Sequence, residues 1–382
     1  MRNFLRFFSF LLFLLVISSC TEPMLPHSVL ELPPSEGNSR NSEGDFILLN
    51  DGSILFAYSK FLKGSGDDHD PSVIALRQSR DKGETWSPED RIIAENQDEP
   101  NGNVMSVSFL RLSAERIAIF YLKKIHDGSE QVFTRVMMKV SDDEGKTWSK
   151  EQDCTQAMPL EYRVVNNSRV IRLSSGRILI PAASHAYHGP GSYDMDSDAR
   201  LYCLYSDDNG ESWQQGEGFY IEEDGKRVIT QEPGVIQMKD GNVLMYIRTN
   251  TGYQWYATSK DGGKTWQDKR HASFTGPLSP AKIVRLDDGR LLNLWNDHEG
   301  REDLLKKGAR TPLTLALSTD EGKTWPKKLN IEDGYDPENI RRFHYCYTAT
   351  LELKDRLLLA YCAHDNLQHL RILSFPKTSL PK

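Results

Sequence analysis

Ionisable side chains recur in this 382-residue sequence just before and just after short apolar segments. Arginines bind carboxylate groups through a planar fork of N–H donors, and the carboxylates, imidazoles and phenols beside them can move protons. One glutamate, one tyrosine and two arginines stand at equivalent places next to different segments. The candidates in chain order are Arg40, Glu43, Asp45, Asp67, Asp68, His69, Asp70, Arg163, Asn166, Asn167, His185, His188, Glu232, Arg248, Arg310, Tyr345 and Tyr347.

The apolar segments occur in pairs around a tight polar turn. Turns such as Asn50-Asp51-Gly52 have apolar residues that alternate or run together on both sides, which is typical of β-hairpins. The sequence therefore predicts six hairpins. They occupy residues 46–58, 107–121, 169–183, 234–248, 282–295 and 349–362.

A second motif, Ser-x-Asp-x-Gly-x-Thr/Ser-Trp, occurs five times. The copies begin at Ser79, Ser141, Ser206, Ser259 and Ser318. Aspartate and glycine favour a turn through side-chain hydrogen bonds and a positive φ angle, and the tryptophan can pack that turn onto its own sheet. We expect these aspartates to be structural rather than catalytic.

Together the two motifs predict a unit of four strands every 60 residues or so. The sixth unit reaches the C-terminus with a third strand over residues 370–374, so its fourth strand must come from residues 29–32 near the N-terminus. This closure protects the sheet edges. The sequence therefore predicts an all-β fold, a six-bladed β-propeller over residues 36–382, with the core between neighbouring blades. The innermost strands line the axis, so the candidate side chains can converge at one mouth.

Composition excludes several classes of protein. Lys plus Arg is 47 and Asp plus Glu is 54, and the net charge of −7 argues against a nucleic-acid partner. With 38% hydrophobic and 26% charged residues, the chain is neither a polytopic membrane protein nor largely disordered.

The cysteines beyond residue 20 lack metal-ligand spacing, so we expect buried thiols and no cofactor or metal. They are Cys154, Cys203, Cys346 and Cys362.

The N-terminus has the pattern of an export signal. Arg2 and Arg6 precede an apolar run over residues 7–17 that is short for a membrane span. Residues 16–20, Val-Ile-Ser-Ser-Cys, resemble a bacterial lipobox. We therefore expect a signal peptide over residues 1–19, lipidation of Cys20, a proline-rich tether over residues 20–35 and an exported protein that meets a bacterial membrane only through this anchor.

The Ser-Asp-Gly-Trp turns resemble the Asp boxes of the sialidase (neuraminidase) superfamily, whose fold is the six-bladed propeller. The resemblance covers nearly all of residues 36–382 and implies a retaining glycosidase with a tyrosine nucleophile. It implies that Tyr347, eight residues before Asp355, is the nucleophile and that Glu232 takes its proton. It assigns the acid/base role to Asp68, eleven residues before Ser79, which requires a raised pKa at this aspartate, and the neighbouring Asp67 and Asp70 are the alternative candidates for the acid.

The same resemblance gives Arg248 and Arg310 the roles of the second and third arginines that bind the substrate carboxylate. Sialidases carry the first arginine in an Arg-Ile-Pro motif nine residues before the first turn aspartate, and here that position is Ser42. Either Arg40 reaches the same place, or only two arginines bind the carboxylate and Glu43 contacts a sugar hydroxyl. Further candidates for the pocket wall are His69, Asn167, His185 and Tyr345.

These expectations describe an exo-glycosidase that removes a terminal sialic acid, or a related acidic sugar, from a glycan or glycoconjugate. Three alternatives stay open. The altered first motif can belong to a glycosidase for another sugar. It can also belong to a polysaccharide lyase in which tyrosine and histidine abstract a proton. The third alternative is a non-catalytic carbohydrate-binding propeller.

Overall fold

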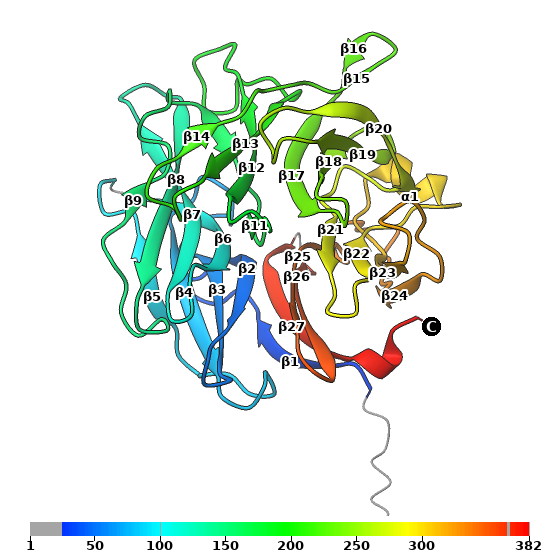
Figure 1. Cartoon of the computed structure of the whole chain (residues 1–382), viewed down its shortest axis with the longest axis horizontal. Helices are drawn as coiled ribbons and strands as arrows, with labels where there is room; N and C mark the ends of the chain where they lie inside the picture. The colour runs from blue at the N-terminus through cyan, green and yellow to red at the C-terminus, as the bar shows by residue number, and fades with distance from the viewer. Residues whose placement is uncertain (1–24, 100, 365–366, 382) are drawn as a thin grey trace, which may run out of the picture.

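Six antiparallel sheets surround a central axis in the computed structural model, which describes residues 25–99, 101–364 and 367–381 (Figure 1). Each sheet is one blade of a propeller, and in the first five blades the strands follow chain order from the axis outward. In blade three the innermost strand is interrupted, and its two pieces both pair with β12. The six predicted hairpins are the two inner strands of the six blades, so the predicted fold is confirmed.

The strands have the following bounds. Blade one contains β2 (Arg40–Leu48), β3 (Ile54–Phe61), β4 (Ser72–Ser79) and β5 (Arg91–Glu95); blade two contains β6 (Val104–Arg111), β7 (Ile117–His126), β8 (Val132–Ser141) and β9 (Gln152–Asp153). Blade three contains β10 (Tyr162–Val164), β11 (Ile171–Arg172), β12 (Ile178–His185), β13 (Arg200–Ser206) and β14 (Gln214–Gln215). Blade four contains β17 (Thr230–Gln237), β18 (Val243–Thr249), β19 (Tyr253–Ser259) and β20 (Gln267–Thr275); blade five contains β21 (Lys282–Arg285), β22 (Leu291–Trp295), β23 (Leu313–Ser318) and β24 (Leu329–Glu332).

The two ends of the chain close the ring in blade six. Its inner strands are β25 (Cys346–Glu352), β26 (Arg356–Ala363) and β27 (His369–Pro376), and its outermost strand is β1 (His27–Leu32). β1 pairs antiparallel with β27, as the blue and red strands in Figure 1 show. Residues 27–32 therefore belong to the propeller. Outside the blades lie the hairpin β15 (Glu222–Glu223) and β16 (Lys226–Arg227), and the short helix α1 (Glu302–Lys307).

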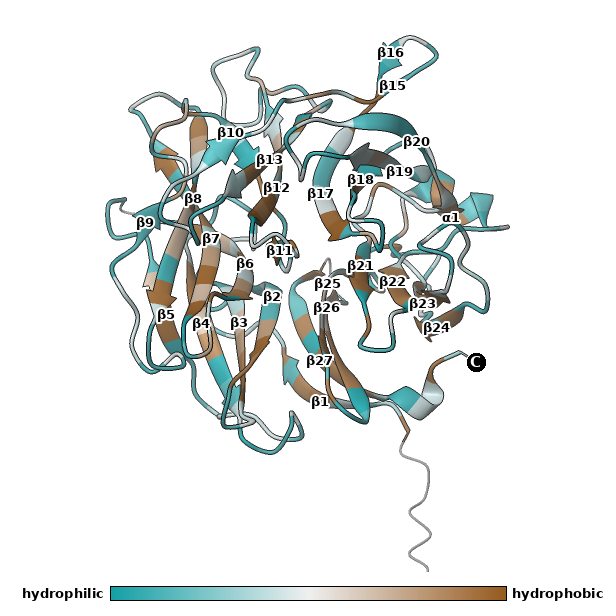
Figure 2. Ribbon diagram, viewed as in Figure 1, coloured by the Kyte–Doolittle hydropathy of each residue, from teal (hydrophilic) through white to brown (hydrophobic). Residues whose placement is uncertain are grey.

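The hydrophobic core is divided among the interfaces between neighbouring blades. Ile54 and Phe56 of blade one, for example, pack with Leu358 and Ala360 of blade six. Figure 2 shows apolar residues concentrated along the blade strands, whereas the connecting loops are mostly polar. Burial of apolar area between twisted sheets is the main stabilising contribution, so each blade depends on its two neighbours.

The five Ser-Asp-Gly-Trp motifs are turns between the third and fourth strands, and their aspartates are structural. In the copy at Ser206, its hydroxyl donates to Asp208 at 2.7 Å and accepts from the Gly210 amide at 2.8 Å. Asp208 also accepts from the amide of Ser212 at 2.9 Å, and the Trp213 indole donates to the Gly210 carbonyl at 3.1 Å. The serine, aspartate and glycine bonds recur in the other four copies.

The four predicted thiols, Cys154, Cys203, Cys346 and Cys362, are buried and free. The predicted signal peptide and the lipidation site Cys20 lie outside the described residues. Within the described ranges, the helices are too short or too polar to cross a membrane.

We predict that Ser206→Ala lowers the free energy of unfolding by about 1–3 kcal/mol, because it leaves the buried Gly210 amide without an acceptor. Urea unfolding followed by tryptophan fluorescence measures the change. Ser212→Ala is the matched control, since its hydroxyl binds the same aspartate at an exposed position. Equal losses in the two variants would contradict the assignment.

Candidate active site

Three of the candidate side chains lie on β-bulges that interrupt the innermost strands, and Ser106 lies on a fourth such bulge in β6. The register shifts between Ser42 and Asp45 in β2, between Gln231 and Gly234 in β17, and between Cys346 and Ala349 in β25. A bulge leaves one residue outside the ladder and redirects its side chain. The redirected residues are Glu43 with φ 52°, Glu232 with φ 43° and Tyr347 with φ 56°. Such angles are uncommon for side chains of this size, and they cluster at functional sites.

Glycine permits two of these bulges to pack closely. A Cβ atom on Gly44 would lie 2.3 Å from the ring of Phe56, and one on Gly234 would lie 2.2 Å from the ring of Tyr246. Both rings are buried in the adjacent strand of the same blade. The sequences Glu43-Gly44 and Glu232-Pro233-Gly234 therefore combine a functional carboxyl with the small residue that its backbone requires.

The bulges open into a cavity of about 400 Å³. Nine of the residues selected from the sequence line it, and they come from blades one, three, four, five and six. These residues are Glu43, Asp68, Arg163, Asn166, His185, Glu232, Arg248, Arg310 and Tyr347. The cavity volume lies within the range of small-ligand sites.

Tyr347, Glu232 and Arg248 form one hydrogen-bonded group on the cavity wall. The Tyr347 hydroxyl donates to Glu232 Oε1 at 3.2 Å, and Arg248 Nη1 donates to Glu232 Oε2 at 2.5 Å. Burial and the negative charge of Glu232 raise the pKa of Tyr347 well above its ordinary value. The phenol is therefore neutral, and Glu232 is placed to accept its proton.

Arg310 lies beside this group. Its Nη1 donates to Cys346 Sγ at 3.2 Å, and its guanidinium carbon lies 5.8 Å from the centre of the Tyr347 ring. Thr311-Pro312 follows with a cis peptide bond before β23. Arg248 and Arg310 thus present two guanidinium groups to one cavity, which suits a carboxylate ligand.

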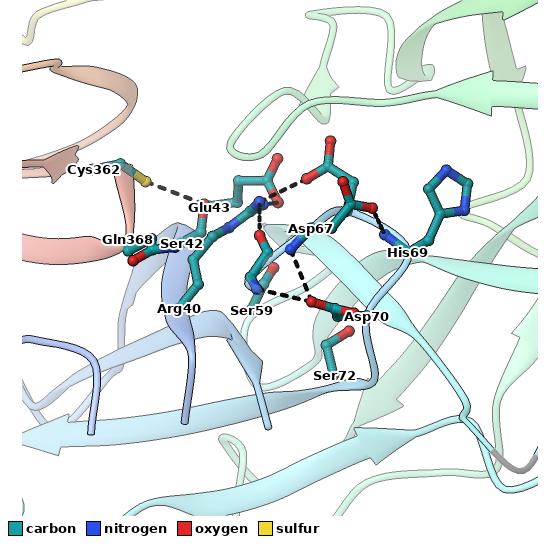
Figure 3. A network of polar contacts seen from close by, with 12 residues as sticks. Arg40, Ser42, Glu43, Ser59, Asp67, His69, Asp70, Ser72, Cys362 and Gln368 are labelled. Carbon is teal, nitrogen blue, oxygen red and sulfur yellow. Dashed lines mark hydrogen bonds and ion pairs between the residues drawn. The ribbon is translucent and has the colours of Figure 1, made fainter. Parts of the chain in front are cut away.

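Arg40 lies between two acidic groups, Asp68 and Glu43, and Figure 3 shows its guanidinium beside Glu43. Its Nη1 donates to Asp68 Oδ1 at 2.7 Å and to the Gly66 carbonyl at 2.9 Å. Its Nη2 lies 3.8 Å from Glu43 Oε2, and the guanidinium covers the ring of Phe61 at 4.1 Å. Arg40 does not line the cavity itself. It acts on the cavity through Asp68 and Glu43.

These contacts shift the pKa values of Asp68 and Glu43 in opposite directions. Enclosure raises the pKa of Asp68, but Arg40 and Lys124 more than offset this effect and lower it to about 2. The raised pKa that we expected at Asp68 is therefore wrong for the ligand-free protein. Burial dominates at Glu43 and raises its pKa to about 8, although Arg40 favours the ionised form.

Eight candidates from the sequence lie outside the cavity wall, namely Arg40, Asp45, Asp67, Asp70, His188 and the three described next. Tyr345 is in the core between blades five and six, and 1% of it is exposed. Asn167 uses its amide to donate to the carbonyls of Gly44 and Tyr347. His69 packs edge-on against Tyr193 with ring centres 4.5 Å apart, behind the cavity rim.

Sequence reasoning missed several residues that line the cavity. Lys124 donates to the carbonyl of Asp68, and burial lowers its pKa to about 8. A lysine that interrupts the apolar run of β7 was the available signal. Tyr193 and Tyr162 also line the cavity, and the Tyr193 hydroxyl donates to Asp67 at 2.5 Å. Tyr193 lies in the long connection between β12 and β13, for which the sequence offered no periodic signal.

The arrangement can perform acid–base and nucleophilic chemistry on a carboxylate-bearing ligand. The Nδ1 atom of His185 donates to the Asp196 carbonyl at 2.7 Å. Within residues 25–99, 101–364 and 367–381, no group of three or more His, Cys, Asp or Glu side chains is suited to hold a metal ion.

A family model and several known proteins match the sequence of this chain. A family model described as the BNR repeat-like domain matches residues 40–359. The anhydrosialidase of Macrobdella decora is 30% identical over 266 residues, which cover 64% of this chain and 32% of that protein. The sialidase of Clostridium perfringens is 29% identical over 238 residues, which cover 58% of each chain. The chain thus spans less than two thirds of the length of these relatives.

Solved structures share the fold. A Hadza microbial sialidase superposes with a TM-score of 0.71 at 19% identity, over 90% of this chain and 67% of that chain. The leech intramolecular trans-sialidase complexed with 2,7-anhydro-Neu5Ac superposes with a TM-score of 0.70 at 15% identity, over 94% and 71%.

The family model spans all six blades, the five Asp-box turns stand at the same place in their blades, and the neighbouring structures are propellers of the same design. On these grounds the chain belongs to the BNR repeat-like family, within the sialidase superfamily.

Proposed function

We propose that this protein is a retaining exo-glycosidase that removes a terminal sugar acid, sialic acid or a related acidic sugar, from a glycan. The observation that carries the proposal is the 3.2 Å hydrogen bond from Tyr347 to Glu232 in a cavity that also holds Arg248 and Arg310. The arginines would bind the carboxylate of the sugar. A neutral phenol beside them can approach the anomeric carbon without charge repulsion.

In the first step the Tyr347 oxygen attacks the anomeric carbon while its proton passes to Glu232. The glycosidic oxygen leaves with a proton from Asp68, and a tyrosyl–sugar bond replaces the glycosidic bond. In the second step Asp68 takes a proton from water, the water oxygen attacks the same carbon, and Tyr347 recovers its proton from Glu232. Two inversions give net retention.

The low pKa of Asp68 keeps its carboxyl ionised in the ligand-free protein, which is the form that the base of the second step requires. For the first step it must carry a proton, so substrate binding has to raise its pKa. A leaving group that covers Asp68 removes water from it, and desolvation disfavours the charged carboxylate. Arg40 and Lys124, which stabilise the charged form in the free protein, therefore oppose proton donation in the first step.

The direct test of the activity is release of 4-methylumbelliferone from its α-sialoside by the protein without residues 1–20. We expect Tyr347→Phe to lower kcat by about 10³-fold or more, and Glu232→Gln by about 10²–10⁴-fold, because the base for the phenol is lost. Tyr345→Phe is the matched control, because Tyr345 is buried in the core, and its kcat should stay close to that of the wild type.

Two results would contradict the proposal. Loss of activity in Tyr345→Phe with retention in Tyr347→Phe would reverse the nucleophile assignment. Absence of release by well-folded protein would exclude a simple sialidase and favour the other readings, namely another glycosidase, a lyase or a carbohydrate-binding propeller.

A second prediction concerns the charge of Asp68. Arg40→Met removes the cation that favours the ionised form, so the pKa of Asp68 should rise from about 2 toward its ordinary value of 3.8. A carbon-13 NMR titration of the aspartate carboxyl groups measures this shift. Arg80→Met, on the exposed turn of blade one, should leave it unchanged, and an unshifted Asp68 in Arg40→Met would contradict the analysis.

We propose further that the protein is exported and anchored to a bacterial membrane through a lipid on Cys20. The support is the sequence of residues 1–20. Metabolic labelling with a fatty-acid analogue should mark the wild type in the bacterial host and leave Cys20→Ser unlabelled. Equal labelling of both proteins would contradict the anchor.

A further inference from the structure

Glu43 occupies the place in blade one that Glu232 and Tyr347 occupy in blades four and six. Each lies eight positions before the aspartate of its hairpin turn, each sits in a bulge of the innermost strand, and all three line one cavity. Blades four and six use this place to present a reactive group to the ligand. The fold therefore presents Glu43 to the ligand as well.

This register explains the departure from the Arg-Ile-Pro motif. Ser42, nine positions before Asp51, is buried, and its hydroxyl lies 3.2 Å from Cys362 Sγ. The residue that the bulge turns into the cavity is Glu43, while Arg40 is held by Asp68 and Gly66 outside the lining (Figure 3). A carboxyl group thus stands in this cavity where the sialidase pattern leads one to expect a guanidinium.

The Glu43 side chain has unused hydrogen-bonding capacity. Glu43 is 4% exposed, and its Oε2 is buried without a hydrogen-bond partner. The charged groups that face it are Arg40, Lys124, Asp68 and Glu232. Burial raises the pKa of Glu43 to about 8, so near neutral pH the carboxyl is uncharged and can both donate and accept.

The arginines of the cavity are only partly available. Arg248 is paired with Glu232 at 2.5 Å, and Arg310 is the second guanidinium on the wall. Arg163 also lines the cavity, but it is fully buried and donates to the Tyr202 hydroxyl and the Pro159 carbonyl. Two available arginines with an additional carboxyl bind a lone carboxylate less strongly than three available arginines do. A hydroxyl group matches Glu43 better, because it exchanges both a donor and an acceptor with the carboxyl.

We infer that Glu43 is a specificity-determining residue that binds a hydroxyl group of the sugar, so that the substrate is a hydroxylated sugar acid whose carboxylate is held by Arg248 and Arg310. The inference rests on the proposed function for the acidic character of the ligand. It adds that blade one, through Glu43, recognises a hydroxyl group of the sugar.

The first test measures binding of 2-deoxy-2,3-didehydro-N-acetylneuraminic acid, a carboxylate analogue, by isothermal titration calorimetry. Glu43→Arg should bind it about tenfold or more weakly than the wild type, since the carboxyl that binds a hydroxyl group of the analogue is then lost. Glu89→Arg, a charge reversal at an exposed loop of the same blade, should show the wild-type affinity. Equal affinities of Glu43→Arg and the wild type would overturn the inference.

The second test uses D-glucuronate, a hydroxylated sugar acid, and saturation-transfer NMR. Glu43→Ala should weaken its binding about tenfold, whereas Glu43→Gln, which keeps hydrogen-bonding groups, should bind within about threefold of the wild type. Unchanged binding in Glu43→Ala would overturn the inference. These mild substitutions decide the question even where Glu43→Arg does not fold.

A third result separates hydroxyl recognition from its closest rival, in which a protonated Glu43 donates to the substrate carboxylate. In that case Glu43→Ala would weaken the binding of D-glucuronate but not that of D-glucose, which keeps the ring hydroxyl groups and has no carboxylate. Such a difference would overturn the hydroxyl assignment. These binding measurements do not depend on hydrolysis. If the affinities of the Glu43 variants change as predicted but the protein does not cleave a sialoside, only the proposed reaction is refuted. If the protein cleaves a sialoside but these affinities do not change, only the role of Glu43 is refuted.

Discussion

The side-chain amide of Asn167 holds together the two blades on which the cavity depends most. Its Nδ2 donates to the carbonyl of Gly44 at 2.7 Å and to the carbonyl of Tyr347 at 3.2 Å. Gly44 follows Glu43 in the bulge of β2, so one side chain from blade three fixes two bulges in blades one and six. A buried carbonyl that loses its donor costs about 1–3 kcal/mol. Because the bulges set the direction of Glu43 and Tyr347, the geometry of the whole site rests on this contact.

Ser168 and Arg169, which follow Asn167 in the chain, extend this connection across the axis. Arg169 donates to the Tyr246 hydroxyl and to the Ala281 carbonyl, both at 2.7 Å, which joins blade three to blades four and five. Lys282 donates to the Ser168 hydroxyl at 2.9 Å, and burial lowers its pKa to about 7. The irregular inner strand of blade three is therefore the part that ties the ring together, whereas the regular strands supply the apolar interfaces.

The fold was predictable because its signals are local. A hairpin turn or a Ser-Asp-Gly-Trp turn needs only adjacent residues, as the bonds around Ser206 and Asp208 illustrate. Glu232 and Tyr347 could be found because each keeps a fixed distance from its turn. The charge of Asp68 could not be predicted, because it depends on Arg40 and Lys124 from separate strands. The contacts of Asn167 were equally invisible, since their acceptors are backbone groups of other blades.

The closure of blade six by β1 has a consequence for how the ring assembles. Leu30 pairs with Ile372 and Leu32 with Leu370, so these partners are separated by nearly the whole chain. Contacts of such long sequence separation form slowly, because the loop-closure entropy is lost before the contact is gained. During synthesis β1 is made before its partner β27, so its edge stays unpaired until β27 has been made. Blade six is therefore incomplete until β27 has been made, and the unpaired edges of its strands favour aggregation until then.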